Sequence, residues 1–282
     1  MATSNSAYQQ MLDRGWLLMD LKNWPLAERE FRQAIALDPQ AGTPRAALAW
    51  CIAQRSVRQA LPEAREAVRL SPTLDYAHYT LAHLLIDARD YTAAGESAEE
   101  ALRLDPRDVN HHALRARLHI ARQEWRPALQ AAEEGLQFDP ANPYCLRWKA
   151  VALRNLGLPI LAEKTTAQLL AAHPEDAAGH EQHAWALLAQ GNADPAETHF
   201  RESLRLSPSS QQAVKGLREA RWSRWLLFRL FRERPKNVVE RGVLFSWYFF
   251  EVALTVSAGI LVLFLLLLVG VLAVLACIHS FF

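Results

Sequence analysis

Apolar and small residues recur along the first 210 residues at the spacing of amphipathic helices. The first such segments are residues 8–20 and 26–37, and steps of three and four positions place the apolar residues of each on one face. These residues are Met11, Gly15 and Leu18 in the first segment, and Ala27, Phe31 and Ala34 in the second. The stretch Lys22-Asn23-Trp24-Pro25 separates the segments, so the pattern predicts two helices joined by a short turn.

This helix pair returns because a proline-containing turn recurs at a fixed interval, for example as Leu37-Asp38-Pro39 and Leu104-Asp105-Pro106. Successive prolines of this kind are 33 or 34 residues apart. A proline cannot continue a helix and disfavours helical geometry in the residue before it, so each one ends a helix. The prolines are Pro39, Pro72, Pro106, Pro140, Pro174 and Pro208. The period predicts an array of about six helix-turn-helix repeats.

Small residues keep the same period at the sites where two helices pack closely. The first helix repeats Gly15, Ala82, Ala116, Ala150 and Ala184, and the second repeats Ala27, Ala60, Ala94, Ala128, Ala162 and Ala196. Four positions later the second helix carries Phe31, Ala64, Ala98, Ala132, Thr166 and Phe200. Together with the closing prolines, this pattern resembles the tetratricopeptide-repeat (TPR) family over roughly residues 8–208. The resemblance implies an all-α, right-handed helical solenoid in which stacked pairs bury one another's apolar faces.

Two features depart from the family pattern. The second period is one residue short, and we expect the missing residue in the turn near Gln54-Arg55. In addition, His78, His112 and His180 occupy a first-helix position where an aromatic residue is commoner in the family. We expect these histidines to fill packing positions, with an effect on the tightness of packing and none on the fold.

Residues 211–241 follow the repeats as a predicted capping helix whose second half is basic and amphipathic. Arginines lie largely on one side of it, whereas Trp, Leu and Phe residues occupy the other, and such a helix can lie in a membrane interface. A solenoid cap with a solvated basic face is the alternative interpretation. The residues predicted at the interface, including two from the following segment, are Arg221, Trp222, Arg224, Trp225, Arg229, Arg232, Trp247 and Tyr248.

The segment 252–278 contains 27 residues and no charged side chain. A bilayer core of about 30 Å requires about 20 apolar helical residues, so this run is long enough to span it. Residues 242–282 are therefore predicted to form a single transmembrane helix that anchors the chain, with an aromatic belt at residues 247–250. The expected organisation is a solenoid over residues 1–210, the capping and juxtamembrane segment, and this anchor.

The charge around the apolar segment predicts its orientation. Between Lys215 and Arg241 there are nine basic and three acidic residues, and no Lys or Arg follows the apolar run. The positive-inside tendency then places the repeats on the cytoplasmic side, and the basic segment favours anionic lipid. The architecture resembles both the mitochondrial fission adaptor and bacterial membrane-tethered repeat proteins, and the Ala- and Arg-rich composition favours a bacterial inner membrane.

Composition excludes several other classes of function. A formal net charge of +1 gives no reason to expect nucleic-acid binding. The first ten residues are polar and predict no signal peptide. Cys51, Cys145 and Cys277 are too few and too scattered for a disulfide framework or a zinc site, and we expect them to be buried or membrane-facing fillers.

The histidines give the only hint of catalytic chemistry. The stretch His180-Glu181-Gln182-His183 resembles a zinc-protease motif, but its histidines are three rather than four residues apart, which changes the helical geometry. His199 on the partner helix offers a third ligand. Packing roles are the favoured interpretation of His180 and His183, so no metal, cofactor or catalytic residue is predicted.

In proteins of the TPR family the first helix of each unit lines a concave groove. The resemblance places nine residues of this chain there, namely Trp16, Tyr76, Tyr79, His83, Arg117, Tyr144, Arg147, Arg154 and Trp185. Aromatic rings and arginines suit an extended peptide, and the three arginines suggest an acidic one. A solvated face with incidental arginines is the alternative. The Lys/Asn clamp of chaperone-tail-binding relatives is absent, so that specificity is not expected.

These observations favour a non-catalytic, membrane-tethered scaffold that binds a protein or peptide partner on the cytoplasmic face of a membrane. The alternative is a structural subunit or assembly factor of a membrane complex, in which the transmembrane helix makes the key contacts. The small residues Ala253, Ser257 and Gly259 give that alternative some support. A metal-dependent enzyme using His180, His183 and His199 is the third hypothesis.

Overall fold

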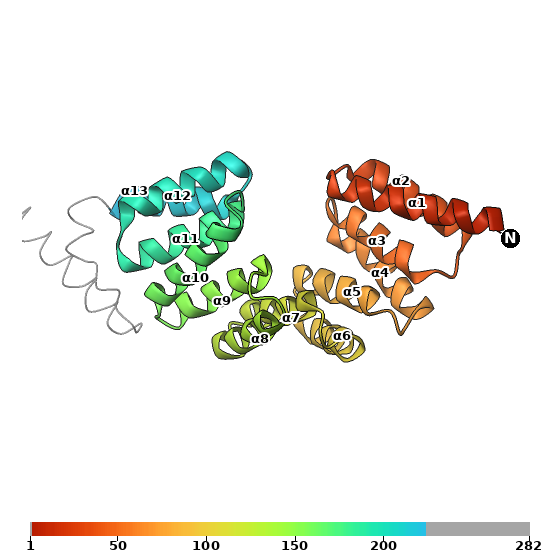
Figure 1. The fold of residues 1–282 in the computed structure, drawn as a ribbon, viewed down its shortest axis with the longest axis horizontal. Helices are drawn as coiled ribbons and strands as arrows, with labels where there is room; N and C mark the ends of the chain where they lie inside the picture. Colours follow the sequence, from red (N-terminus) through yellow and green to blue (C-terminus); the bar gives the residue numbers. More distant parts are fainter. Residues whose placement is uncertain (1, 224–282) are drawn as a thin grey trace, which may run out of the picture. The chain divides into compact units, whose positions relative to one another are not determined.

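The computed structural model describes residues 2–223, and within them thirteen α-helices follow one another with no β-strand. Figure 1 shows these helices joined by short turns in chain order. The helices are α1 (Ala2–Asp20), α2 (Trp24–Leu37), α3 (Gly42–Ala53), α4 (Val57–Leu70), α5 (Asp75–Asp87), α6 (Tyr91–Leu104), α7 (Val109–Ala121), α8 (Trp125–Phe138), α9 (Pro143–Asn155), α10 (Pro159–Ala172), α11 (Ala177–Gln190), α12 (Ala193–Leu206) and α13 (Gln211–Ser223). The predicted all-α helix-turn-helix array is confirmed for this part of the chain.

The odd-numbered helices α1 to α11 are the first helices of six repeats, and the even-numbered ones are the second helices. Each helix packs against the next one along the chain. From α3 onward, each first helix also contacts the next first helix, and α11 contacts α13 in the same way. Within residues 2–223, no comparable contact joins one second helix to the next. The first helices therefore come closest together on one side of the array, which we call the first-helix face.

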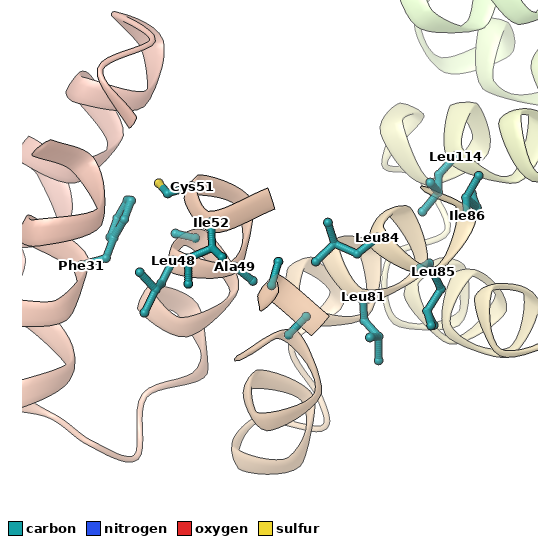
Figure 2. Close-up of a cluster of buried hydrophobic side chains, with 14 of the residues drawn as sticks. Phe31, Leu48, Ala49, Cys51, Ile52, Leu81, Leu84, Leu85, Ile86 and Leu114 are labelled. Atoms are coloured by element: carbon teal, nitrogen blue, oxygen red, sulfur yellow. The ribbon is translucent and has the colours of Figure 1, made fainter. Parts of the chain in front are cut away.

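The predicted packing positions are the most deeply buried sites of the array. The alanine at the repeated packing position has no solvent exposure in any of the six second helices. These residues are Ala27, Ala60, Ala94, Ala128, Ala162 and Ala196. The residues four positions later are at most 1% exposed. Figure 2 shows side chains of this core from Phe31 through Leu48 and Ile52 to Leu84. Helix-on-helix burial of small residues thus holds successive elements together.

Two phenylalanines interrupt this alanine pattern, and a glycine accommodates each of them. A Cβ atom at Gly15 would lie 2.5 Å from Cε1 of Phe31, and one at Gly216 would lie 2.2 Å from Cε1 of Phe200. Both rings are fully buried, so neither can move into solvent. The size of the residue on one helix is therefore set by the side chain it faces on the next.

The histidines that replace an aromatic residue fasten the turns between repeats. In three repeats a ring Nε2 lies 2.9 Å from the carbonyl oxygen of the proline six residues earlier, in the pairs His78–Pro72, His112–Pro106 and His180–Pro174. A carbonyl oxygen only accepts, so Nε2 carries the proton in each ring. Arg45, at the same position of the second repeat, donates to the Pro39 carbonyl at 3.4 Å. The expected packing role is confirmed for His78 and His112, which are buried.

Five of the six turns within repeats contain a residue in left-handed conformation, and these are Lys22, Arg89, Gln123, Gly157 and Gly191. The N–H of the following residue bonds to a carbonyl five positions earlier, as in a Schellman motif. The turn after α3 differs, because Gln54 has a φ of −60° and the Ser56 N–H bonds to Ile52, four positions earlier. The expected deletion in this turn is confirmed, and it removes the left-handed residue.

Residues 224–282 lie outside the described part of the chain. The predicted transmembrane anchor belongs to them, as do six predicted interface residues, Arg224, Trp225, Arg229, Arg232, Trp247 and Tyr248. In residues 2–223, no helix combines the length and the apolar character needed to cross a bilayer. The predicted cap begins at Gln211 as α13, which buries Ala213 and Ala220 against the last repeat.

The left-handed turns give a prediction about stability. Substituting the exposed Gln123, whose φ is 62°, with glycine is expected to raise the free energy of unfolding by about 0.5–1 kcal/mol, because glycine adopts this conformation without a Cβ clash. Urea denaturation followed by circular dichroism measures the change. As a control, Gln54→Gly in the right-handed second turn is expected to lower that free energy by a similar amount. Equal signs for the two variants would contradict the prediction.

Candidate functional site

Five aromatic side chains from α1, α3 and α5 form one cluster on the first-helix face. Trp16 lies 5.6 Å from Tyr76, and Tyr76 stacks with Tyr79 at 6.4 Å between ring centroids. Trp50 approaches Tyr79 at 6.5 Å and His83 at 4.3 Å. We call Trp16, Trp50, Tyr76, Tyr79 and His83 the aromatic cluster. All five are only half-buried, so the cluster keeps an accessible surface.

Four members of this cluster were predicted from the sequence, and Trp50 was missed. Trp50 lies 34 residues after Trp16 and therefore holds the same place in the second repeat. The period identifies this position, because the deletion expected near Gln54-Arg55 comes after Trp50 and leaves the register of α3 unchanged. Its edge-to-face contact with Tyr79 is of a kind worth about 0.5–1.5 kcal/mol beyond area burial.

A small charge network lies beside the aromatic cluster. Asp87 Oδ1 accepts a hydrogen bond from Arg117 Nη2 at 2.5 Å, and Asp87 Oδ2 lies 3.5 Å from His83 Nδ1. Burial alone would raise the pKa of Asp87, but the neighbouring His83 and Arg117 outweigh it and lower that pKa. Burial also lowers the pKa of His83, against the pull of Asp87. Arg117 therefore binds a carboxylate of the same chain, and this ion pair links α5 to α7.

Arg147 is engaged in a similar way. Its Nη2 lies 2.9 and 3.1 Å from the two carboxylate oxygens of Asp176, the N-cap residue of α11. Its guanidinium carbon also lies 5.4 Å from the ring centroid of Tyr144. Tyr144 itself is 50% exposed, which makes it the most accessible aromatic residue among the predicted groove residues. Arg147 thus joins α9 to α11 and supports one face of an accessible ring.

Arg154 and Trp185 also meet across neighbouring first helices. The guanidinium carbon of Arg154 lies 5.6 Å from the Trp185 ring centroid, a cation–π distance, and Arg154 Nη1 donates to Gln182 at 3.3 Å. The three predicted groove arginines therefore all interact within the chain. An acidic partner would have to compete with Asp87 and Asp176 for two of them, so the arginine cluster is not an open anion site.

The tyrosines of the face are held neutral, and several polar atoms beside them have no partner within the described residues. Burial, followed by the neighbouring Tyr144, raises the pKa of Tyr79 to about 12, and burial raises that of Tyr76 further. Atoms buried without a hydrogen-bond partner in residues 2–223 include Arg117 Nη1 and Arg147 Nε. Such groups carry a desolvation cost that water or a bound chain would relieve.

The three histidines of the zinc hypothesis do come together. His180 Nδ1 lies 3.0 Å from His199 Nδ1, and the rings of His183 and His199 are 4.5 Å apart between centroids. Because Nε2 of His180 donates to Pro174, its Nδ1 is the acceptor and His199 Nδ1 donates. Burial first, and then His183 and His180, lower the pKa of His199 to about 4.

The third ring of this group is fixed by Thr166. Its single hydroxyl proton is shared between the carbonyls of Ala162 and Glu163, so its oxygen accepts from His183 Nδ1 at 2.8 Å. Burial lowers the pKa of His183. The three rings therefore act as packing and hydrogen-bonding groups. Within residues 2–223, the ligand atoms of His180, His183 and His199 do not converge as a three-ligand metal group.

The remaining predicted residues have structural surroundings. Cys51 and Cys145 are buried, and burial raises the pKa of each thiol to about 12, so neither is a reactive thiolate at neutral pH. Of the predicted interface residues within the described part, Arg221 donates to the buried Glu197 at 3.1 Å. Trp222 is 60% exposed at the end of α13.

The comparisons with known proteins agree with this repeat structure. The model of the tetratricopeptide repeat matches residues 12–75, 79–143 and 147–211. The chain belongs to the tetratricopeptide-repeat family. No curated protein matches the chain significantly.

Solved TPR structures share the fold at low sequence identity. The Cut9 and Hcn1 hetero-tetramer of the APC/C is similar with a TM-score of 0.67 at 20% identity, over 76% of this chain and 42% of that one. This chain thus spans under half the length of that protein. PilF of Pseudomonas aeruginosa is similar with a TM-score of 0.60 at 17% identity, over 77% and 99% of the two chains. A TPR protein from Parabacteroides merdae gives 0.63 at 14% identity, over 76% and 84%. Identities this low show the fold alone.

The histidine group gives a prediction about pH. An unfolded histidine titrates near pH 6.5, whereas His199 in the fold titrates at about 4, so the unfolded chain binds more protons between these values. The free energy of unfolding is therefore expected to fall as pH falls from 7 to 5. His199→Gln is expected to make that fall shallower in urea denaturation. The exposed His173→Gln serves as the matched control, and an equal flattening by both variants would contradict the assignment.

Proposed function

We propose that this TPR protein is a non-catalytic scaffold whose first-helix face binds an extended segment of a protein partner. The aromatic cluster is the observation that carries this proposal, because half-buried Trp and Tyr rings are the side chains that contribute most to protein interfaces. Such rings present a flat apolar area on which a partner chain can pack.

The chemistry of the face favours an apolar or aromatic segment over a purely acidic one. Arg117 and Arg147 already have carboxylate partners, so their charges are largely balanced. Tyr144, which is 50% exposed on α9, adds accessible aromatic area on a later first helix. An extended chain following the first helices would meet the cluster and Tyr144 in turn.

The proposal includes a membrane anchor. The uncharged run at 252–278 and the basic excess before it support a single C-terminal transmembrane helix with the repeats on the cytoplasmic side, in a bacterial inner membrane. Tethering raises the effective concentration of a bound partner near membrane targets, so modest affinity is enough. On this proposal the partners are one protein segment and, through the anchor, membrane lipid.

Site-specific cross-linking in cells tests the binding face. A photoreactive amino acid replaces Tyr144 on α9 in one full-length protein and Ile160, 70% exposed on α10 of the same repeat, in a second. We expect a discrete cross-linked partner from position 144 and none from position 160. Trp50→Ala in the first protein is expected to weaken binding by about 30-fold, the effect of losing about 2 kcal/mol at an interface anchor.

The same experiment can contradict the proposal. A partner cross-linked from position 160 alone would place binding on the second helices. Equal cross-linking from both positions would show no preference for the first-helix face. Insensitivity of the position 144 product to Trp50→Ala would exclude the aromatic cluster as its anchor. Circular dichroism of the Trp50→Ala protein shows whether the helices survive the substitution.

A structural subunit or assembly factor of a membrane complex is the second candidate, favoured by the small residues Ala253, Ser257 and Gly259 in the apolar run. Replacing residues 242–282 with an unrelated single-pass anchor separates the two candidates. A scaffold that works through its repeats keeps its position 144 cross-links and its cellular function. A subunit that works through helix contacts in the membrane loses its function although it remains membrane-bound.

A further inference from the structure

We propose that Asp75, Asp108 and His111 form a binding site for a divalent first-row metal ion such as Zn²⁺. Among residues 2–223, one carboxylate oxygen from each aspartate and one ring nitrogen of His111 lie within 4.8 Å of one another. The three side chains come from the starts of α5 and α7, at the junction of the third and fourth repeats. This site is separate from the proposed partner-binding function and does not depend on it.

His111 is the residue that distinguishes this group from an ordinary pair of surface carboxylates. Its side chain is only 2% exposed, so the ring is not solvated as a surface histidine would be. Its Nδ1 lies 3.2 Å from the Asp105 carbonyl oxygen, which can only accept, so Nδ1 carries a proton. In the neutral ring the lone pair is then on Nε2. A histidine whose other nitrogen donates to a backbone carbonyl has the usual arrangement of a metal ligand.

Nε2 is the ring nitrogen of His111 that lies beside the two carboxylates. His111 Nε2 lies 3.5 Å from Asp75 Oδ2 and 3.8 Å from Asp108 Oδ2, too far for good hydrogen bonds. A tetrahedral zinc ion with bonds of about 2.1 Å has its ligand atoms about 3.4 Å apart. The observed separations therefore leave room for an ion after small side-chain adjustments.

The two carboxylate oxygens of Asp108 make different contacts. Oδ1 caps α7 by accepting from the Asn110 N–H at 2.7 Å and from Asn110 Nδ2 at 3.0 Å. Oδ2 is the atom on the His111 side. The cap holds the carboxylate in place without using the oxygen that would bind metal. In the described residues, no Lys or Arg forms an ion pair with Asp75 or Asp108, so no side-chain cation of this kind balances their two charges.

The donor set selects the class of ion. One imidazole nitrogen and two carboxylate oxygens suit Zn²⁺ and similar transition metals, whereas Mg²⁺ prefers oxygen ligands alone in octahedral geometry. Three protein ligands leave at least one coordination position for water. The Tyr79 ring, 5.7 Å from the His111 ring, covers another side of this histidine.

Calorimetry on metal-stripped, full-length protein tests the site with ZnCl₂ as the probe. We expect one saturable Zn²⁺ per chain and no saturable Mg²⁺. Asp75→Asn and Asp108→Asn are each expected to weaken Zn²⁺ binding at least 10-fold, since the loss of an outer-shell group alone costs 10–100-fold. Asn keeps the helix cap at position 108, so the fold is preserved. Asp139→Asn, in the equivalent turn one repeat later, is the matched control and should bind as the wild type does.

Several outcomes would overturn the proposal. One is the absence of saturable Zn²⁺ binding, and another is binding that neither site variant changes. Loss of binding in His199→Gln alone would assign the ion to the His180, His183 and His199 group instead. A Zn²⁺-dependent rise in Tm, present in wild type and Asp139→Asn and absent in both site variants, checks the result independently of calorimetry.

Discussion

Close approach of neighbouring helices is the constraint on which the array depends. Six second-helix alanines have no exposed surface, and at the two sites where a phenylalanine follows, the opposing helix supplies Gly15 or Gly216. Since each helix packs on the next, a larger side chain at one such site would move every later helix relative to the earlier ones. This explains why the period of small residues was such a clear signal in the sequence.

Periodic features could be predicted from the sequence because they depend on local spacing alone. The helix pairs, the alanine stripes and the altered second turn all follow from a 34-residue register. Interactions between repeats were harder to predict. The pairing of Arg117 with Asp87, and the meeting of Asp75 with Asp108 and His111, join residues about one repeat apart whose rotamers and helix positions decide whether they touch. Trp50 lay within reach of prediction, because it keeps the register of Trp16.

The polar contacts change the interpretation of the first-helix face. From the sequence, its arginines resembled open sites for an acidic partner, whereas in the fold each bridges neighbouring first helices or supports an aromatic ring. Their ion pairs and ring contacts thus join α5 to α7 and α9 to α11. What remains accessible is mainly aromatic, so specificity would come from shape and from a few hydrogen bonds more than from net charge.

The linear arrangement of contacts also determines how disturbances spread. Each repeat touches only its neighbours, so local opening of one pair leaves distant pairs folded, as in a one-dimensional chain of coupled units. The Trp16–Tyr76 contact is an exception, because it joins the first repeat directly to the third. It couples α1 directly to α5, so opening of the first repeat has to separate these two rings as well as the packing of α2 on α3.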